Sequence, residues 1–247
     1  MTQSQVLILQ HVPWEKPGRI LDGLDDLGLS YQIMNVAKEK KPEFPDFDEV
    51  AGVVLMGGPM GALDYDKYPG LKAEAKLTRA AVSVGKPVLG VCLGHQIIAT
   101  ALGAKLKSGD APEIGFAPIK RVDKHDFFSM WNKTVDVLHW HNDVVTLPEG
   151  AQPLARSEKT KNQAFRFGSI SLGSHADPAG GVARRAGYGQ GSESRRRIEI
   201  EAARGVRRMQ SATAASCRSG FLRIRCPMQF IRAVIAGLNC PSSNYQR

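Results

Sequence analysis

The sequence predicts a doubly wound α/β domain whose central sheet is mostly parallel. Short apolar runs alternate with helical stripes through the first hundred residues, and one of these runs turns abruptly into a helix at residue 92. An alternation of strand, helix and strand implies right-handed crossovers, which build a parallel sheet covered on both faces. The 247 residues are enough for one large domain of this class or two smaller ones.

The first half of the chain contains the strands and helices on which this prediction rests. Three apolar runs are typical of buried parallel strands, at residues 5–10, 31–36 and 50–56. Residues 19–29 carry apolar side chains at helical spacing, with Gly28 as a stop signal. Residues 42–48 are a loop rich in proline and acidic residues, and residues 71–84 have the stripe of another helix.

Cys92 lies at the junction of a predicted strand and a predicted helix. The apolar run 87–91 is typical of a buried strand, and a helical stripe starts at Leu93. Gly90 and Gly94 flank the cysteine, and glycines allow a tight turn and a close approach of the backbone. A polar residue in such a turn is typical of a nucleophile elbow.

Two physical effects favour a nucleophilic cysteine at this position. The positive end of the helix dipole stabilises a thiolate. The backbone N–H groups that follow the cysteine point at any oxyanion that its attack produces. The alternative is that Cys92 is a small buried apolar residue, as most lone cysteines are. Spacing alone does not separate the two interpretations.

The segment Gly-Val-Cys-Leu-Gly-His-Gln at residues 90–96 resembles the signature of the class I, or triad, glutamine amidotransferases. The resemblance implies a flavodoxin-like fold and a Cys92 that attacks the side-chain amide of glutamine. It also implies that Gln96 lines the glutamine pocket, although an exposed polar residue on the helix is the alternative. His95 is expected to face away. The Pro-Glu-Ile-Gly segment at residues 112–115 resembles stand-alone members that are similar to the amidotransferase domain of GMP synthase.

A Gly-Gly-Pro loop at residues 57–59 directly follows the third predicted strand. Ligands of open α/β sheets bind beyond the carboxyl ends of the strands, and glycines there free backbone N–H groups to stabilise a negative charge. An ordinary Gly-Pro turn is the commoner use of such a sequence. The resemblance implies that Gly58 contributes to the oxyanion hole, with the N–H of Leu93 as the second donor.

The second half of the chain is predicted to add further strands. They comprise a turn and strand at residues 103–107, a strand led by residues 111–119, one at 135–145, and two short strands within 151–167. A short helix is expected from Asp126 through Trp131.

Two histidines and an aspartate occur close together in the predicted strand at residues 135–145. His139 and His141 are two residues apart, so they share one face of the strand, and Asp143 follows. Such a group could bind a metal ion, but no third and fourth ligand stand in register, so we predict none. The Trp-His-x-Asp segment instead resembles the family's segment at the rim of the glutamine pocket, which implies substrate-binding roles for His141 and Asp143.

Family members continue through a strand reading roughly Gly-Leu-Gln-Phe-His-Pro-Glu, in which the histidine is the general base and the glutamate orients it. This chain has Ser-Ile-Ser-Leu-Gly-Ser-His-Ala-Asp-Pro at residues 169–178. His175 and Asp177 keep the spacing of the pair, so they are the candidates for the two catalytic roles. The apolar residues before the histidine are missing, and aspartate is one methylene shorter than glutamate.

The charge of the chain divides it into two segments. Residues 1–168 contain 20 Lys+Arg and 20 Asp+Glu, whereas residues 169–247 contain 13 Arg, no Lys and four acidic residues. Residues 180–197 are rich in Gly, Ser and Arg and low in apolar residues, a composition typical of disorder. We therefore predict an amidotransferase domain at residues 1–178 that lacks the family's closing strand and helices. An Arg-rich tail, non-native or disordered, follows at residues 179–247.

Two hypotheses explain the tail. A reading frame displaced near residue 169 would produce arginine without lysine and scattered cysteines, as translation of the wrong frame of GC-rich DNA does. A genuine basic arm would instead attract the phosphates of a nucleic acid. Few aromatic residues and no nucleic-acid-binding motif occur there, so we favour the displaced frame and expect no nucleic-acid partner.

The motifs together imply that glutamine is hydrolysed to glutamate and ammonia through a cysteine thioester, without a cofactor. The chain carries no recognisable acceptor domain, so a separate synthase subunit would use the ammonia, or the substrate would be another γ-glutamyl small molecule. The first residues lack the features of a signal peptide, and no apolar run could span a membrane, so a cytoplasmic protein is expected.

Two other functions are compatible with the sequence. One is a catalytically inactive amidotransferase-like scaffold whose basic tail is an interaction arm, which the missing His-x-Glu pair favours. The other is a different cysteine-dependent enzyme of the same fold, such as a peptidase. The Gly-His-Gln sequence at residues 94–96 favours an amidotransferase over a peptidase.

Overall fold

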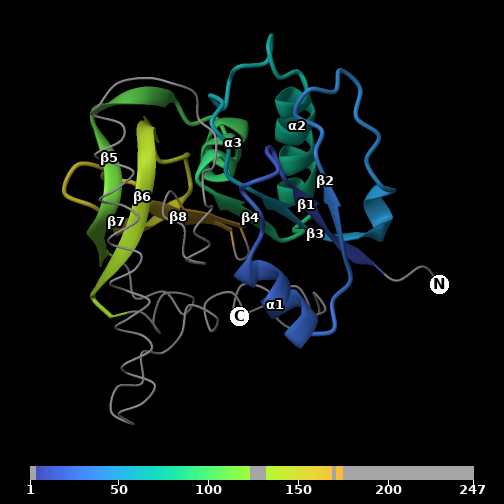
Figure 1. Ribbon diagram of the computed structural model, residues 1–247, viewed down its shortest axis with the longest axis horizontal. Helices are drawn as coiled ribbons and strands as arrows, with labels where there is room; N and C mark the ends of the chain where they lie inside the picture. Colours follow the sequence, from blue (N-terminus) through green and yellow to red (C-terminus); the bar gives the residue numbers. More distant parts are fainter. Residues whose placement is uncertain (1–3, 123–131, 169–170, 175–247) are drawn as a thin grey trace.

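A computed structural model describes residues 4–122, 132–168 and 171–174 of the chain. Its strands form one sheet in the order β2-β1-β3-β4-β9-β8-β7-β5-β6 (Figure 1). The strands are β1 (Gln5–Leu9), β2 (Tyr31–Met34), β3 (Val50–Leu55), β4 (Val88–Val91), β5 (Leu106–Arg121), β6 (Thr134–Val145), β7 (Gln152–Arg156), β8 (Ala164–Phe167) and β9 (Ser171–Ser174). The helices are α1 (Arg19–Asp26), α2 (Gly70–Ser83), α3 (Leu93–Ala101) and the single 3-10 turn η1 (Phe47–Glu49).

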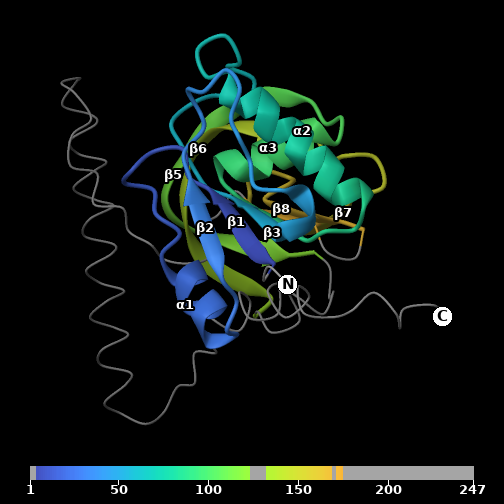
Figure 2. The ribbon, with the colours of Figure 1, turned by 90° about the vertical axis from the view of Figure 1, so that its right-hand side faces the viewer.

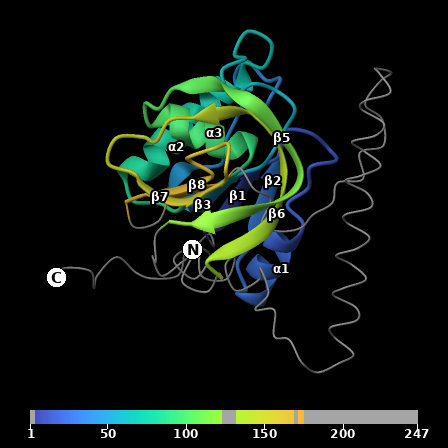
Figure 3. The same cartoon turned by 90° about the vertical axis from the view of Figure 1, so that its left-hand side faces the viewer.

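The parallel half of the sheet confirms the predicted doubly wound α/β fold. β1 pairs in parallel with β2 and β3, β3 pairs with β4, and β4 pairs with β9. β5 to β8 are antiparallel to their neighbours, and β9 joins the two halves through β8. The long strands β5 and β6 curve together at one end of the sheet (Figure 3).

Residues 106–121 form the single strand β5, where the sequence predicts two separate strands. The pairing with β6 is interrupted between Ser108 and Glu113, where the register shifts. A β-bulge of this kind accommodates extra residues without ending the strand. The hydrophobic pattern therefore shows a break, although the backbone continues through it.

Helices cover both faces of the parallel strands, as the buried apolar runs require (Figure 2). Val6 and Ile8 of β1 pack on one face with α1, whereas Leu7 and Leu9 pack on the other face with α2 and α3. Successive side chains of a strand point to opposite faces. A strand that is buried on both sides is therefore apolar along its whole length.

The short strand β9 occupies the place where the sequence analysis expects the family's closing strand to be missing. Its residues pair with β4 on one side and β8 on the other, with Ser174 opposite Val91. The sequence Ser-Leu-Gly-Ser lacks the apolar run of a buried strand, which is why the pattern does not predict it. Backbone hydrogen bonds to two neighbours define the strand instead.

Several predictions concern residues outside the described ranges: the helix at 126–131, the residues His175 and Asp177, and the tail at 179–247. These remain predictions. Within the described ranges, none of the helices has the length and apolar character needed to span a bilayer.

The contact between α3 and the sheet leaves no space for side chains at two glycines. A Cβ atom on Gly94 would overlap the carbonyl group of Leu55, and one on Gly90 would lie 2.6 Å from the carbonyl carbon of Gly94. The first turn of α3 therefore lies directly on β3 and β4. This close contact restricts the three residues between the two glycines, with Cys92 in the middle.

We predict that Gly94→Ala lowers the free energy of unfolding by about 1–3 kcal/mol, the usual cost of overpacking a core. Urea unfolding followed by circular dichroism measures this change. Lys76→Ala, at an exposed position of α2, should change stability by less than about 0.5 kcal/mol. Equal stabilities of Gly94→Ala and wild type would contradict the close contact.

Candidate active site

Cys92 occupies a strained turn between β4 and α3. It is the N-cap of α3 with φ 54° and ψ −106°, and it is the one non-glycine residue with a positive φ in the described ranges. Such a backbone is costly for an L-residue and is typical of functional sites. The side chain is half-buried. The structure thus has the tight strand–helix turn that the sequence predicts at this residue.

The Gly-Gly loop that follows β3 lies against this turn. A Cβ atom on Gly57 would lie 3.6 Å from the Cβ of Cys92, and one on Gly58 would lie 2.9 Å from a Cδ of Leu93. The N–H of Gly94 donates to the carbonyl of Met56 at 3.1 Å, which joins the helix start to the loop. The structure therefore brings together Cys92 and both residues predicted to form the oxyanion hole.

A buried ion pair that the sequence analysis missed holds the Gly-Gly loop. His11, at the end of β1, places Nδ1 3.1 Å from the carbonyl oxygen of Gly57 and Nε2 2.8 Å from Oε2 of Glu74 on α2. The side chains of His11 and Glu74 are 0% and 1% exposed. Carbonyl and carboxylate oxygens only accept hydrogen bonds, so both ring nitrogens donate and the imidazole is protonated.

The surroundings of His11 agree with this protonation state. Burial by itself lowers the pKa of His11, but the hydrogen bond and the charge of Glu74 outweigh it, so the pKa is raised above 6.5. The side chain of Asn35 also donates to the backbone carbonyl of His11 at 3.2 Å. Two interactions therefore position this residue from outside the loop.

The contact with His11 determines the direction of the proposed oxyanion donor. The carbonyl of Gly57 and the N–H of Gly58 belong to one planar trans peptide unit, in which they point in opposite directions. Because His11 holds the carbonyl, the N–H must point away from His11. Glu74 lies 63 positions from His11 along the chain, and no local pattern links the two.

The residues predicted to bind glutamine also lie together. Gln96 is 5% exposed, and its Nε2 donates to the carbonyl oxygen of Asp143 at 3.4 Å. The Nδ1 of His141 lies 3.2 Å from the same oxygen. The alternative of an exposed Gln96 is therefore wrong. His95 is buried with its ring centroid 5.0 Å from that of Phe165.

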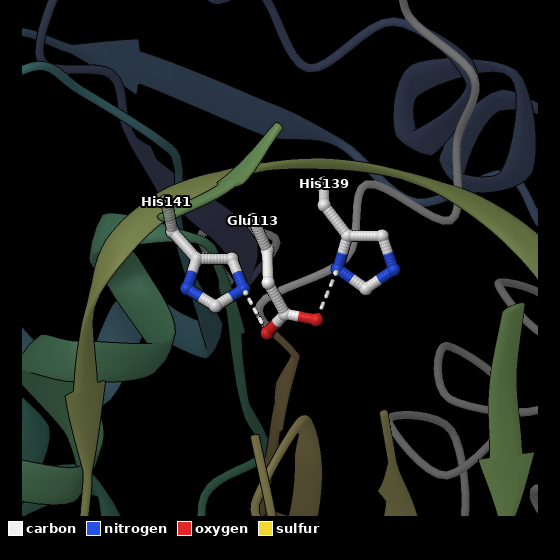
Figure 4. Close-up of side chains that lie close together, drawn as sticks. All are labelled: Glu113, His139 and His141. Atoms are coloured by element: carbon white, nitrogen blue, oxygen red, sulfur yellow. Dashed lines mark ion pairs between the residues drawn. The ribbon is translucent and has the colours of Figure 1, made fainter. Parts of the chain in front are cut away.

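The predicted pocket wall continues into a buried cluster of Glu113, His139 and His141 (Figure 4). Glu113 stands opposite His141 in the β5–β6 pairing. One carboxylate oxygen lies 3.4 Å from Nε2 of His141 and the other lies 3.8 Å from Nδ1 of His139. The sequence analysis predicted that the two histidines share a face, but it did not recognise the carboxylate between them.

The ionisation of this cluster follows from its burial. Burial raises the pKa of Glu113, but hydrogen bonds from Ser157 and Thr160, together with the two imidazoles, lower it more. Burial also lowers the pKa of both His139 and His141, and Glu113 offsets this only in part. In this cluster the pKa of Glu113 and the pKa values of both histidines therefore lie below their ordinary values.

We predict that the His11–Glu74 pair makes stability depend on pH. Because the folded pKa of His11 is raised, its contribution is complete below about pH 6.5 and is lost as the pH rises through the folded pKa. His11→Gln should cost about 3–5 kcal/mol just below pH 6.5, where wild-type His11 is protonated, because it leaves the Glu74 carboxylate buried without its partner. Urea unfolding at several pH values should show that the difference in free energy of unfolding between His11→Gln and wild type becomes smaller at high pH.

The double variant His11→Gln/Glu74→Gln is the matched control. It removes both charges. Its loss in free energy of unfolding should therefore be smaller than the sum of the losses in the two single variants. Additive effects at every pH would show that the two side chains are not coupled.

Comparisons with known proteins match more than half of the chain to one family. The family model for "glutamine amidotransferase class-I" matches residues 18–169. The glutamine amidotransferase-like protein YfeJ of Salmonella typhimurium is 32% identical over 68% of this chain and 73% of its own. One of the subunits of the glutamine-hydrolysing GMP synthase of Sulfolobus acidocaldarius is 33% identical over 59% of this chain and 73% of its own.

Solved structures agree with this assignment. A glutamine amidotransferase of Thermotoga maritima has a TM-score of 0.68 and 26% identity, covering 96% of this chain and 97% of that one. A glutamine amidotransferase of Methylobacillus flagellatus has a TM-score of 0.71 at 22% identity, over 99% of both chains, and shows the same fold. Because the family model also spans more than half of the sequence, including the elbow and the Gly-Gly loop, the chain belongs to the class I glutamine amidotransferases.

Proposed function

We propose that this chain hydrolyses the side-chain amide of glutamine in the cytoplasm, producing glutamate and ammonia, with Cys92 as the nucleophile. The observation that carries the proposal is the strained backbone of Cys92 at the start of α3, with the Gly-Gly loop in contact with it. A thiol at a helix N-terminus is more acidic than a free thiol, because the helix dipole stabilises the thiolate.

The first half of the reaction forms a thioester. The Cys92 thiolate attacks the amide carbon, and the carbonyl oxygen becomes an oxyanion that accepts hydrogen bonds from the N–H groups of Gly58 and Leu93. The C–N bond then breaks, and the general acid donates a proton so that ammonia leaves.

The second half of the reaction hydrolyses the thioester. Water, deprotonated by the same group acting as a base, attacks the thioester and releases glutamate and the thiolate.

We assign the acid–base role to His175, oriented by Asp177. The proposal is supported by the register of β9, in which Ser174 pairs with Val91. His175 follows Ser174 in the sequence as Cys92 follows Val91. Parallel neighbours reach the same edge of a sheet with their carboxyl ends, so the residues that follow two paired positions are suited to act on one substrate.

Gln96, His141 and Asp143 form the proposed wall of the glutamine pocket. The hydrogen bonds of Gln96 and His141 to the carbonyl of Asp143 support this assignment, because they hold the segment beside the elbow helix. Relatives that are named as subunits of GMP synthase suggest that the ammonia passes to a separate synthase protein. A γ-glutamyl small molecule in place of glutamine is the alternative substrate.

One observation favours an inactive scaffold as a second candidate. The family's His-x-Glu pair is replaced by His175 and Asp177, and the apolar residues before it are missing. The shorter aspartate reaches less far toward the imidazole. In that case the basic segment would make the chain an interaction module, which would bind a polyanion rather than turn over glutamine.

We predict that the purified chain releases glutamate from glutamine, and that Cys92→Ala abolishes this activity. His175→Ala should lower kcat by about 10²–10⁴-fold, the usual contribution of a general acid–base group. A coupled glutamate dehydrogenase assay measures both changes. Asn142→Ala, at an exposed position beside the proposed pocket wall, is the control that should retain the wild-type rate.

Labelling with a diazoketone analogue of glutamine separates the two candidate functions. Mass spectrometry should find the label on Cys92 in wild type and in His175→Ala, because labelling needs the nucleophile and the pocket. Neither glutamate release nor labelling in wild type would favour the scaffold. An unchanged rate in His175→Ala would show that another residue is the base.

A further inference from the structure

The cluster around Glu113 contains a fourth polar side chain that completes a compact arrangement. The Nε2 atom of Gln163 lies 2.8 Å from Oε2 of Glu113, 3.4 Å from Nδ1 of His139 and 3.3 Å from Nε2 of His141. The ligand atoms of the other three residues all lie within 4.8 Å of one another. Zinc ligands in a tetrahedral site lie about 3.4 Å apart, given metal–ligand distances near 2.1 Å. The four side-chain tips are therefore close enough together to bind one ion.

Hydrogen bonds to backbone carbonyls outside the cluster determine which nitrogen of each imidazole is protonated. The other nitrogen of each ring faces into the cluster with its lone pair. Nε2 of His139 lies 3.2 Å from the carbonyl oxygen of Ala117, and Nδ1 of His141 lies 3.2 Å from that of Asp143. A carbonyl accepts, so these two nitrogens carry the protons in the neutral rings. The inward nitrogens are then unprotonated. Histidines that bind metals have this arrangement, with the outer N–H donated to a carbonyl or carboxylate.

The amide of Gln163 points its nitrogen into the cluster, where Glu113 also accepts hydrogen bonds from Ser157 and Thr160. Its Nε2 has two hydrogens but faces four acceptors, since Oγ of Ser157 lies 3.1 Å away in addition to Glu113 and the two imidazoles. The Oε1 atom of the same amide is buried without a hydrogen-bond partner. Rotating the amide by half a turn would place Oε1 inside the cluster, where a cation would bind it.

We propose that Glu113, His139, His141 and Gln163 bind a zinc ion, through a carboxylate oxygen, Nδ1, Nε2 and the amide oxygen respectively. A cation at the centre would bind the inward nitrogens of the two imidazoles, a carboxylate oxygen of Glu113 and, once the amide is rotated, the oxygen of Gln163. Two imidazoles favour zinc over calcium or magnesium, which prefer oxygen ligands. Four protein ligands leave no open position, so the site is structural rather than catalytic.

The ion would connect parts of the sheet that are distant in sequence. Glu113 lies on β5, His139 and His141 lie on β6, and Gln163 lies in the turn before β8. His141 also contacts the carbonyl of Asp143, so the zinc would stiffen the proposed pocket wall. This inference goes beyond the proposed glutamine hydrolysis, and its test does not use enzyme activity.

The test is a titration of the untagged, chelator-treated full-length protein with Co²⁺ and Zn²⁺. Wild type should bind one equivalent of Co²⁺ with the visible absorption of a tetrahedral ion, and Zn²⁺ should displace it. Thiolate ligands produce an intense near-ultraviolet charge-transfer band, so its absence distinguishes this site from the four cysteines of the chain. Zn²⁺ should also raise the melting temperature, because it binds the folded state.

Variants then assign the ligands. Loss of an outer-shell partner weakens metal binding by about 10–100-fold. Glu113→Gln and His139→Gln each remove a direct ligand, so each should weaken Co²⁺ binding by more than this. Glu149→Gln, at an exposed carboxylate, and His95→Gln, at a buried histidine outside the cluster, should bind as wild type does.

Two results would overturn the proposal. Wild type could show no tetrahedral Co²⁺ spectrum and no rise in melting temperature with Zn²⁺. Alternatively, its bound Co²⁺ could show thiolate bands. The cluster would then be a hydrogen-bonded network that needs no metal. Both results come from the wild-type protein, so they are informative even if a ligand variant does not fold.

Discussion

The close contact between the start of α3 and the strands β3 and β4 is the constraint on which the site depends. Only hydrogen atoms fit between Gly94 and the backbone of Leu55, and between Gly90 and the backbone of Gly94. The chain must therefore turn within the three residues between these glycines, and Cys92, the middle one, takes the positive φ that results. The same contact brings the helix N-terminus to the loop after β3, so one packing constraint places both Cys92 and the N–H groups beside it.

Buried charges hold the backbone segments around this turn. The His11–Glu74 pair fixes the peptide between Gly57 and Gly58, and the Glu113 cluster adjoins the segment at His141 and Asp143. Buried charges are costly unless each is paired and hydrogen-bonded. Both groups therefore have little freedom to rearrange. The hydrogen bonds of His11 to Gly57 and of His141 to Asp143 restrict the backbone at these two positions. Loops at the edge of the sheet can therefore hold defined positions.

The sequence predicts the parallel half of the fold and the elbow because both depend on local patterns. Apolar runs predict buried strands, and two glycines around a polar residue predict a tight strand–helix turn. The buried polar groups could not be predicted, because their members are distant along the chain: His11 lies 63 positions from Glu74, and Glu113 lies 50 from Gln163. Only the register of β5 against β6 brings Glu113 opposite His141, and hydrophobic periodicity does not determine register across a bulge.

The strand β9 is a second feature that hydrophobic patterns do not predict, and it directly precedes the proposed catalytic residue His175 in the sequence. Its sequence has no apolar run, yet it pairs on both sides, with β4 and with β8. A central strand gains hydrogen bonds from two neighbours whatever its side chains are, so the sheet can accept a polar segment that propensity would reject. The polar sequence of β9 is therefore compatible with a defined register against both neighbours. What the proposed catalysis needs from this segment is that register, because Ser174 opposite Val91 is the pairing that precedes both His175 and Cys92 in the sequence.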